Sequence, residues 1–122
     1  MDNPYKALGV FEPFSFLGIN FMVDEAFKKV LCAGMSGRLK STKQDLKEAV
    51  YSLERAIKAS HNGEVYSGKA TQYKTSDINN CMAAYESILK TPEKQLAAAR
   101  MILIFMQSNN PLHLKDAIEA LS

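Results

Sequence analysis

TPEKQLAAARMILIFMQ, residues Thr91–Gln107, is the stretch that decides the fold. Thr91 can cap a helix, and Pro92 suits the first helical position because the N–H that it lacks is not needed there. In Leu96–Met106 only one residue is charged, so the last turns are apolar on every side. The sequence therefore predicts a central apolar helix over Pro92–Gln107 that the rest of the chain surrounds.

The composition indicates a single domain spanning residues 1–122. Of the 122 residues, 47% are hydrophobic and 23% are charged, which is enough apolar material for a hydrophobic core. No apolar run approaches the roughly 20 residues of a membrane span, and the start of the chain lacks the layout of a signal peptide. We therefore expect a cytoplasmic protein that does not enter a membrane.

Helical spacing of apolar residues predicts four further main helices. Asp24 is the expected cap of the first, and Ser41 or Thr42 of the second. The third follows Thr75-Ser76-Asp77, and the last follows Pro111. The apolar faces are formed by Ala26, Phe27, Val30 and Leu31; by Leu46, Ala49, Val50, Leu53, Ala56 and Ile57; by Ile78, Cys81, Met82, Tyr85, Ile88 and Leu89; and by Leu112, Leu114, Ala117, Ile118 and Leu121.

Three segments lie outside these helices. Asn3–Val10 is expected to form a helical turn, and Glu64–Lys74 a surface loop. The aromatic-rich segment Phe11–Val23 is compatible with a helix or with a buried irregular strap. Since no strand is predicted, the fold class is all-α, a compact bundle of about five helices with an N-terminal turn. Met101–Met106 should pack against Leu112–Leu121 and the strap.

Positive charge is concentrated in the middle of the chain. The net charge of +2 divides into −3 for residues 1–25, +6 for residues 26–74 and −1 for residues 75–122. A local basic surface can attract an acidic partner. The candidate residues for a protein-binding basic face are Lys28, Lys29, Arg38, Lys40 and Lys43.

Catalytic and metal chemistry find little support in the pattern. His61, His113, Cys32 and Cys81 occur singly, without the close spacing of zinc ligands. Both cysteines fall on predicted apolar faces, where free structural thiols are expected rather than nucleophiles or a disulfide. We therefore expect no enzyme, no cofactor and no metal site.

Two further patterns concern anions. The backbone N–H groups at the start of the Ser41 helix, which Arg38, Lys40 and Lys43 flank, are a candidate for weak anion binding. Tyrosines and lysines alternate in the later loop, an arrangement used by proteins that bind single-stranded nucleic acids. A small nucleic-acid-binding or regulatory protein is thus the alternative function. The loop residues concerned are Tyr66, Lys69, Tyr73 and Lys74.

Three stretches, in chain order, resemble a J domain, the helical module of DnaJ-type co-chaperones. Asn3-Pro4-Tyr5-Lys6-Ala7-Leu8-Gly9-Val10 resembles the opening of the family. Ala26-Phe27-Lys28-Lys29-Val30-Leu31 resembles its basic second helix, and Ala84–Lys94 the end of its third helix and the start of its fourth. The resemblance implies a J-like helical hairpin, with Asp24–Gly34 antiparallel to Ile78–Lys90.

The family's His-Pro-Asp signature, which stimulates ATP hydrolysis by DnaK-type chaperones, falls on Met35, Ser36 and Gly37. The resemblance therefore implies a degenerate J-like scaffold that lacks the ATPase-stimulating motif. Its basic second helix, including Lys28 and Lys29, would still bind a protein. Our leading hypothesis is a chaperone-related adaptor, a non-catalytic module that binds or modulates another protein.

Overall fold

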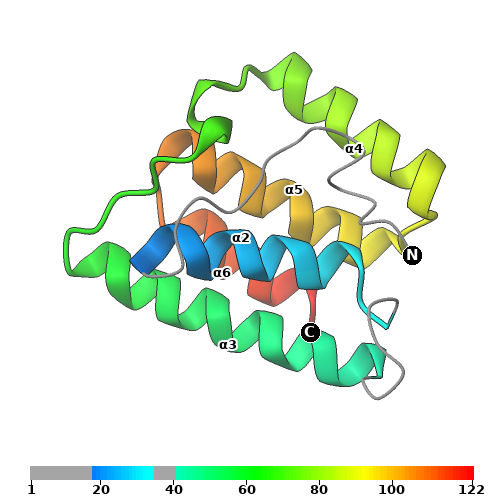
Figure 1. Ribbon diagram of the computed structural model, residues 1–122, viewed down its shortest axis with the longest axis horizontal. Coiled ribbons are helices and arrows are strands. Elements are labelled where there is room, and N and C mark those ends of the chain that lie inside the picture. Colours follow the sequence, from blue (N-terminus) through cyan, green and yellow to red (C-terminus); the bar gives the residue numbers. More distant parts are fainter. Residues whose placement is uncertain (1–17, 35–40) are drawn as a thin grey trace.

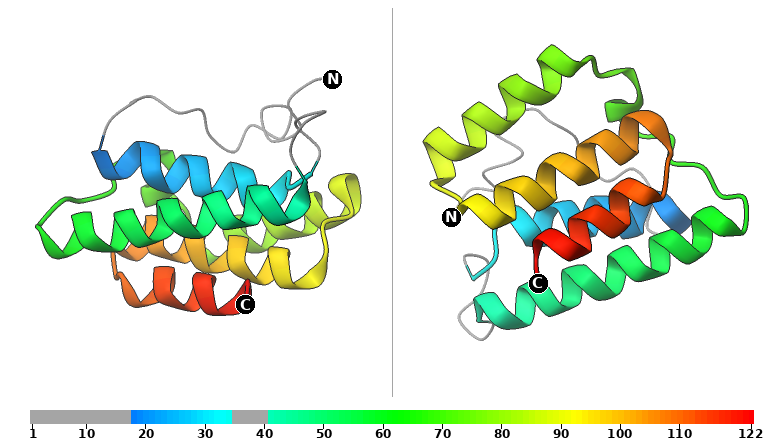
Figure 2. Two further views of the ribbon diagram at one scale, coloured as in Figure 1. Left: turned by 90° about the horizontal axis from the view of Figure 1, so that it is seen from below. Right: turned by 180° about the vertical axis from the view of Figure 1, so that it is seen from behind.

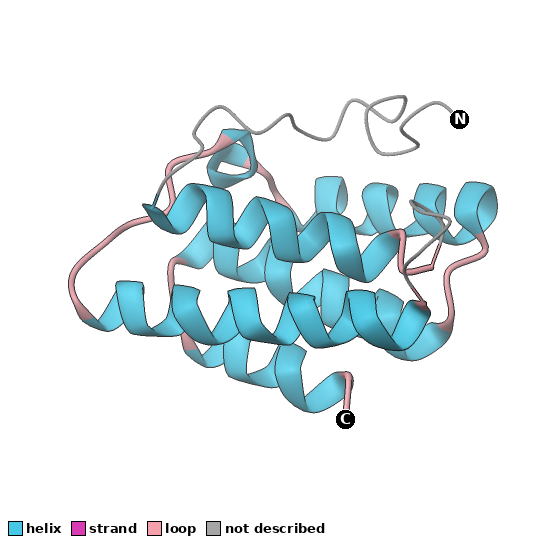
Figure 3. Ribbon diagram, turned by 60° about the horizontal axis from the view of Figure 1, so that its bottom comes forward, coloured by secondary structure: helices cyan, strands magenta, loops and turns pink. Residues whose placement is uncertain are grey.

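The computed structural model describes residues 18–34 and 41–122. This part of the chain is helical and contains no strand, which confirms the all-α fold class (Figure 1, Figure 3). The predicted N-terminal turn, the first part of the strap (residues 11–17) and residues 35–40 lie outside the described ranges. The elements are α2 Gly18–Leu31, α3 Thr42–His61, the 3-10 helix η1 Lys69–Gln72, α4 Thr75–Leu89, α5 Glu93–Ser108 and α6 Leu112–Ala120.

α5 is the central helix of the bundle. It contacts α2, α4, α6 and η1, and the views from the front and from behind both place it between α4 and the other helices (Figure 1, Figure 2). It packs most extensively on α6, the helix expected, together with the strap, to cover Met101–Met106. Six of its side chains are fully buried: Ala98, Ala99, Ile102, Leu103, Phe105 and Met106.

The expectation that the rest of the chain surrounds the last turns of α5 on every side is wrong. Met101 and Ile104 are half-buried, and Ala97 is exposed. These positions recur every three or four residues, so they form a narrow, less covered stripe along the helix, although Met101 and Ile104 still pack against the edge of the core. Even this apolar helix falls short of a bilayer crossing, and so does every other helix in the described ranges.

Two side chains near the start of α5 complete the hydrogen bonding of α2. Gln95 Nε2 donates to the Val30 carbonyl at 2.9 Å, and Thr91 Oγ1 donates to the Leu31 carbonyl at 3.5 Å. The last carbonyls of an α-helix have no partner within the helix, so both contacts satisfy groups that burial would otherwise leave without one. The prediction that Thr91 caps α5 is therefore wrong, and Pro92 occupies the N-cap position.

α2 begins at Gly18, well before the predicted cap Asp24. Asp24 lies in the middle of the helix and is only 2% exposed, so its assignment as a cap is wrong. The Ile19 N–H donates instead to Glu64 Oε1, at 3.2 Å, from the loop after α3. A carboxylate at a helix N-terminus accepts from an unsatisfied N–H and interacts favourably with the helix dipole. A residue distant in sequence therefore caps α2.

Two residues assigned to apolar faces are exposed instead. Ile88 is 59% exposed near the end of α4, and Leu112 is 58% exposed at the start of α6. Ile88 lies in the last turn of α4 and Leu112 in the first turn of α6. The other residues of the predicted faces are buried or pack against the core.

The main hairpin of the bundle is formed by α2 and α3, which run antiparallel (Figure 1). α2 also packs on α5, and α4 packs on α5 as well. α2 and α4 meet where the rings of Phe27 and Tyr85 lie edge to face, with centroids 5.8 Å apart. The antiparallel pairing that the J-domain resemblance implies for these two helices is therefore wrong, since they run in roughly the same direction and share only a local contact (Figure 1, Figure 2).

Candidate functional site

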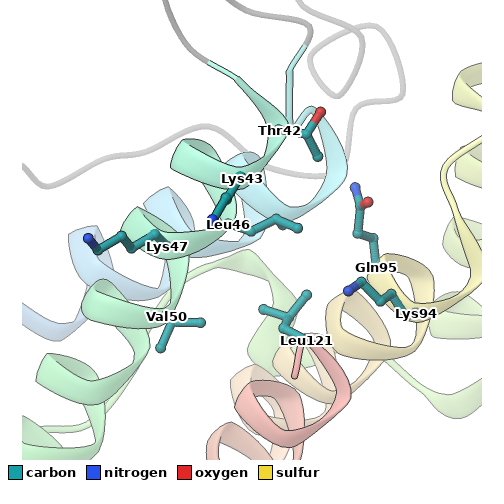
Figure 4. A pocket seen from close by; sticks show the side chains of 8 residues that line it. All are labelled: Thr42, Lys43, Leu46, Lys47, Val50, Lys94, Gln95 and Leu121. Atoms are coloured by element: carbon teal, nitrogen blue, oxygen red, sulfur yellow. The ribbon is translucent and has the colours of Figure 1, made fainter.

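An open groove of about 580 Å³ lies between α3, the first turn of α5 and the residue after α6. Figure 4 shows Leu46 and Val50 of α3 on one side, with Leu121 and Lys94 across from them. The apolar side chains are buried or half-buried, whereas the lysines are exposed, so the lysines rim an apolar floor. The residues that line this lysine-rimmed groove are Thr42, Lys43, Leu46, Lys47, Val50, Lys94, Gln95 and Leu121.

α3 builds one wall because four of its residues share a face. Residues 43, 46, 47 and 50 are separated by three or four positions, the spacing of neighbours on one side of an α-helix. Ser41 fixes where this face begins, since its Oγ accepts from the Gln44 N–H at 3.1 Å, as expected of an N-cap. At 1.5 Å per residue, the wall extends about 10 Å along the helix.

The opposite wall is held in place by the core. Lys94 and Gln95 belong to the first turn of α5, and the Gln95 side chain is anchored to the Val30 carbonyl of α2. Leu121, 9% exposed, follows α6, which packs against both α3 and α5. Contacts within the chain therefore fix the position of this wall.

The three lysines of the groove lack an acidic partner in the described part of the chain. None of Lys43, Lys47 and Lys94 forms an ion pair there, and all three are exposed. Lys43 and Lys47 also carry like charges one turn apart on α3. The groove thus presents uncompensated positive charge beside apolar surface.

The structure separates the predicted basic face into different environments. Lys43 lies in the groove, whereas Arg38 and Lys40 fall outside the described residues. Lys28 and Lys29 are half-buried on α2 and do not line the groove.

Lys29 is an interhelical cation. Its Nζ lies 2.8 Å from Glu48 Oε1 on α3 and 3.5 Å from Glu25 Oε1 on α2. Burial lowers the pKa of Lys29, but the hydrogen bond to Glu48 and the charges of both carboxylates outweigh it, so the pKa is raised. Lys29 therefore joins α2 to α3.

The start of α3, the candidate for weak anion binding, already has internal partners. The side chain of Ser41 occupies the Gln44 N–H. Asp45, in the same turn and 2% exposed, accepts from the Gly34 N–H at 2.8 Å through Oδ2. An acidic side chain in this turn competes with an external anion for the positive end of the helix dipole.

The segment predicted as a surface loop contains a buried anchor. Tyr66 is 1% exposed, and its hydroxyl donates to Asp24 Oδ1 at 2.7 Å. The side chain of Asn109 accepts from the Tyr66 N–H at 2.7 Å and donates to the Tyr66 carbonyl at 3.2 Å. Gly68 leaves room for the Tyr66 ring, since a Cβ there would lie 2.2 Å from the hydroxyl oxygen. Tyr66 is therefore structural and cannot stack on a nucleic-acid base.

Asp24 has altered acid–base chemistry because it is buried. Burial raises its pKa to about 6, and the hydrogen bond from Tyr66 offsets part of the rise. Burial and the nearby Asp24 carboxylate also raise the pKa of Tyr66. This pair ties the loop to α2, but it does not line the groove.

The cysteines and histidines do not assemble into a site in the described ranges. Cys32 is buried and Cys81 is half-buried, both are free, and burial raises the pKa of each thiol. A raised pKa favours the less nucleophilic thiol form. Across the same ranges, no three histidine, cysteine or acidic side chains come together in a metal-binding arrangement.

Of the eight residues that line the groove, sequence reasoning named only Lys43 as a candidate site residue. Lys47 lies in the basic middle of the chain, one helical turn after Lys43, which is a local signal. Lys94 and Leu121 give no such signal, because only the packing of α5 and α6 brings them to α3. Comparison with family models, curated proteins and solved structures gave no match to this chain.

Proposed function

We propose that the chain is a non-catalytic protein-interaction module that binds another protein through the lysine-rimmed groove. The observation that carries this proposal is the combination of three exposed lysines, without ion pairs in the described residues, and an apolar floor. Apolar surface bordered by charged residues is typical of protein-binding sites. The charges would orient and attract the partner, while the floor would supply apolar contact.

The chemistry of the groove supports binding rather than catalysis. Its lining, as far as the chain is described, contains no histidine, cysteine or carboxylate that could work with a lysine as an acid–base pair. The J-like ancestry remains a prediction from the sequence, and the proposal does not depend on it. A chaperone-related or adaptor role would follow only if the partner proved to be a chaperone.

Photo-crosslinking from within the groove tests the proposal. A benzophenone amino acid at Thr42, an exposed lining residue, should form a covalent adduct with a protein in cells that express the chain. The same probe at Tyr51, which is 62% exposed on α3 but does not line the groove, is the matched control. The Thr42 adduct should disappear in the K43E/K47E background. A protein adduct that forms equally from both positions, or that persists in that background, contradicts the proposal.

A nucleic-acid-binding function is the second candidate, because the same three lysines could neutralise phosphates. With three cations, the logarithm of the binding constant should fall with the logarithm of salt concentration with a slope of about −2 to −3. Fluorescence anisotropy with a labelled oligonucleotide at several salt concentrations measures this slope. Binding that is absent, or insensitive to salt, excludes this candidate.

A further inference from the structure

The dimensions of the lysine-rimmed groove restrict what can occupy it. One wall is the α3 face of residues 43, 46, 47 and 50, which extends about 10 Å, or about two helical turns. The other wall is short and consists of the first turn of α5 and Leu121. A site of this size accommodates a short segment of a partner rather than a whole domain.

The charges of the groove favour an acidic occupant. Lys43 and Lys47 lie on the α3 wall and Lys94 on the α5 side, so the positive groups flank the apolar floor (Figure 4). The nearest carboxylates on α3 are engaged elsewhere, since Glu48 pairs with Lys29 and Asp45 with the Gly34 N–H. Acidic residues of a partner would therefore meet lysines without displacing an internal ion pair.

The apolar floor favours a helical peptide over a nucleic acid. Leu46 and Val50, one turn apart, face Leu121 and offer aliphatic contacts to apolar side chains at helical spacing. Single-stranded nucleic acids rely on aromatic side chains for base stacking. No aromatic residue is among those lining the groove in the described part of the chain.

We infer that the groove binds a short acidic amphipathic helix of another protein. This inference rests on the proposed function and adds the chemistry of its partner. The apolar stripe of the peptide would lie on Leu46, Val50 and Leu121, with glutamates or aspartates on both sides reaching the lysines. Because the contact is small, the dissociation constant should be on the order of 10–100 µM.

Titration of the isotope-labelled full chain with synthetic peptides tests this inference. The probe is a peptide of about 14 residues with leucines at positions i, i+3, i+4 and i+7 and glutamates elsewhere. One matched peptide carries lysines in place of the glutamates, and another carries alanines in place of the leucines. The acidic leucine peptide should bind at least about tenfold more tightly than either. Its chemical-shift changes should centre on residues 42–50, 94–95 and 121.

Charge-reversal variants locate the site independently. K43E/K47E should weaken binding of the acidic peptide at least about tenfold, whereas K58E/K115E, which reverses two exposed lysines outside the groove, should leave it within about twofold. Folding of each variant is checked by its amide spectrum. Equal effects of both double variants, shift changes elsewhere, or equal binding of the lysine peptide would overturn the inference.

The peptide experiment and the crosslinking experiment can fail separately. If the peptide does not bind while Thr42 still forms a protein adduct that depends on Lys43 and Lys47, the partner chemistry is wrong and the proposed function stands. If neither gives a signal, both are wrong. Tighter binding of an oligonucleotide to the same residues would show that the groove recognises a phosphate backbone rather than an acidic helix.

Discussion

Asp24 makes the stability of the protein depend on pH. Burial raises the pKa of this carboxyl from 3.8 to about 6. The folded protein therefore keeps a proton that the unfolded chain releases in this interval. The contribution of Asp24 to the free energy of unfolding is therefore fully present below pH 3.8, and it is lost as the pH rises through about 6. A difference of about two pKa units corresponds to about 3 kcal/mol in the free energy of unfolding.

The variant D24N isolates this effect, because asparagine is neutral and keeps an oxygen that can accept the Tyr66 hydroxyl. Above about pH 7, we expect D24N to be more stable than the wild type by about 1–3 kcal/mol, and the difference should shrink toward pH 4. Urea unfolding at several pH values measures it. The same substitution at the exposed Asp116 is the control. Parallel stability profiles for wild type and D24N would contradict the role of Asp24.

Asn109 combines two roles that substitutions can separate. Its φ is 58°, in the left-handed region, and its side chain makes two hydrogen bonds to the Tyr66 backbone. N109G keeps the backbone geometry accessible but loses both bonds, so it should lower the free energy of unfolding by about 1–2 kcal/mol. N109A adds backbone strain and should cost about 1 kcal/mol more. Urea unfolding measures both variants. Equal free energies of unfolding for N109G and N109A would show that backbone strain contributes nothing. A wild-type free energy of unfolding for N109G would show that the two hydrogen bonds contribute nothing.

At the scale of helices, the contact between α5 and the end of α2 is open to a direct test. Q95M should destabilise the protein by about 1–3 kcal/mol, because it leaves the buried Val30 carbonyl without its donor. Gln107 donates in the same way to the Tyr73 carbonyl, but at an exposed site where water can replace it. Q107M should therefore change the free energy of unfolding by less than about 0.5 kcal/mol. Thermal unfolding of both variants gives the comparison, and equal costs would contradict the role assigned to Gln95.

The same contacts explain which parts of the helices the sequence could predict. Apolar periodicity identified α3, α4, α5 and α6 because each buries a continuous face against a neighbour. Periodicity does not specify a boundary whose hydrogen-bond partner lies far away in the chain. Glu64 caps α2 across such a distance, and Thr91 satisfies a carbonyl of α2 rather than the start of α5. Local capping rules therefore misplaced Asp24 and Thr91.

Across the whole molecule, the candidate site was less predictable than the fold. The concentration of basic residues indicated a positive surface, and Lys43 belongs to it. The sequence could not show that Lys29 is engaged with Glu48, since the two meet only when α2 packs on α3. Nor could it place Lys94 and Leu121 beside Lys43, because that juxtaposition depends on how α5 and α6 meet α3. Tertiary packing, rather than local pattern, defines the groove.

The groove also predicts a small energetic cost in the free protein. Lys43 and Lys47 repel one another one turn apart near the positive end of the α3 dipole, so K47Q should raise the free energy of unfolding by about 0.2–0.5 kcal/mol at low salt. Lys58 follows the exposed Glu54 by one turn of α3, so K58Q removes an attraction between opposite charges. It should therefore lower the free energy of unfolding by a similar amount. Urea unfolding at low and high sodium chloride measures both differences, which should shrink together as salt screens the charges. If the two substitutions change stability in the same direction at low salt, the three lysines of the groove are not electrostatically uncompensated, and the acidic partner loses its main support.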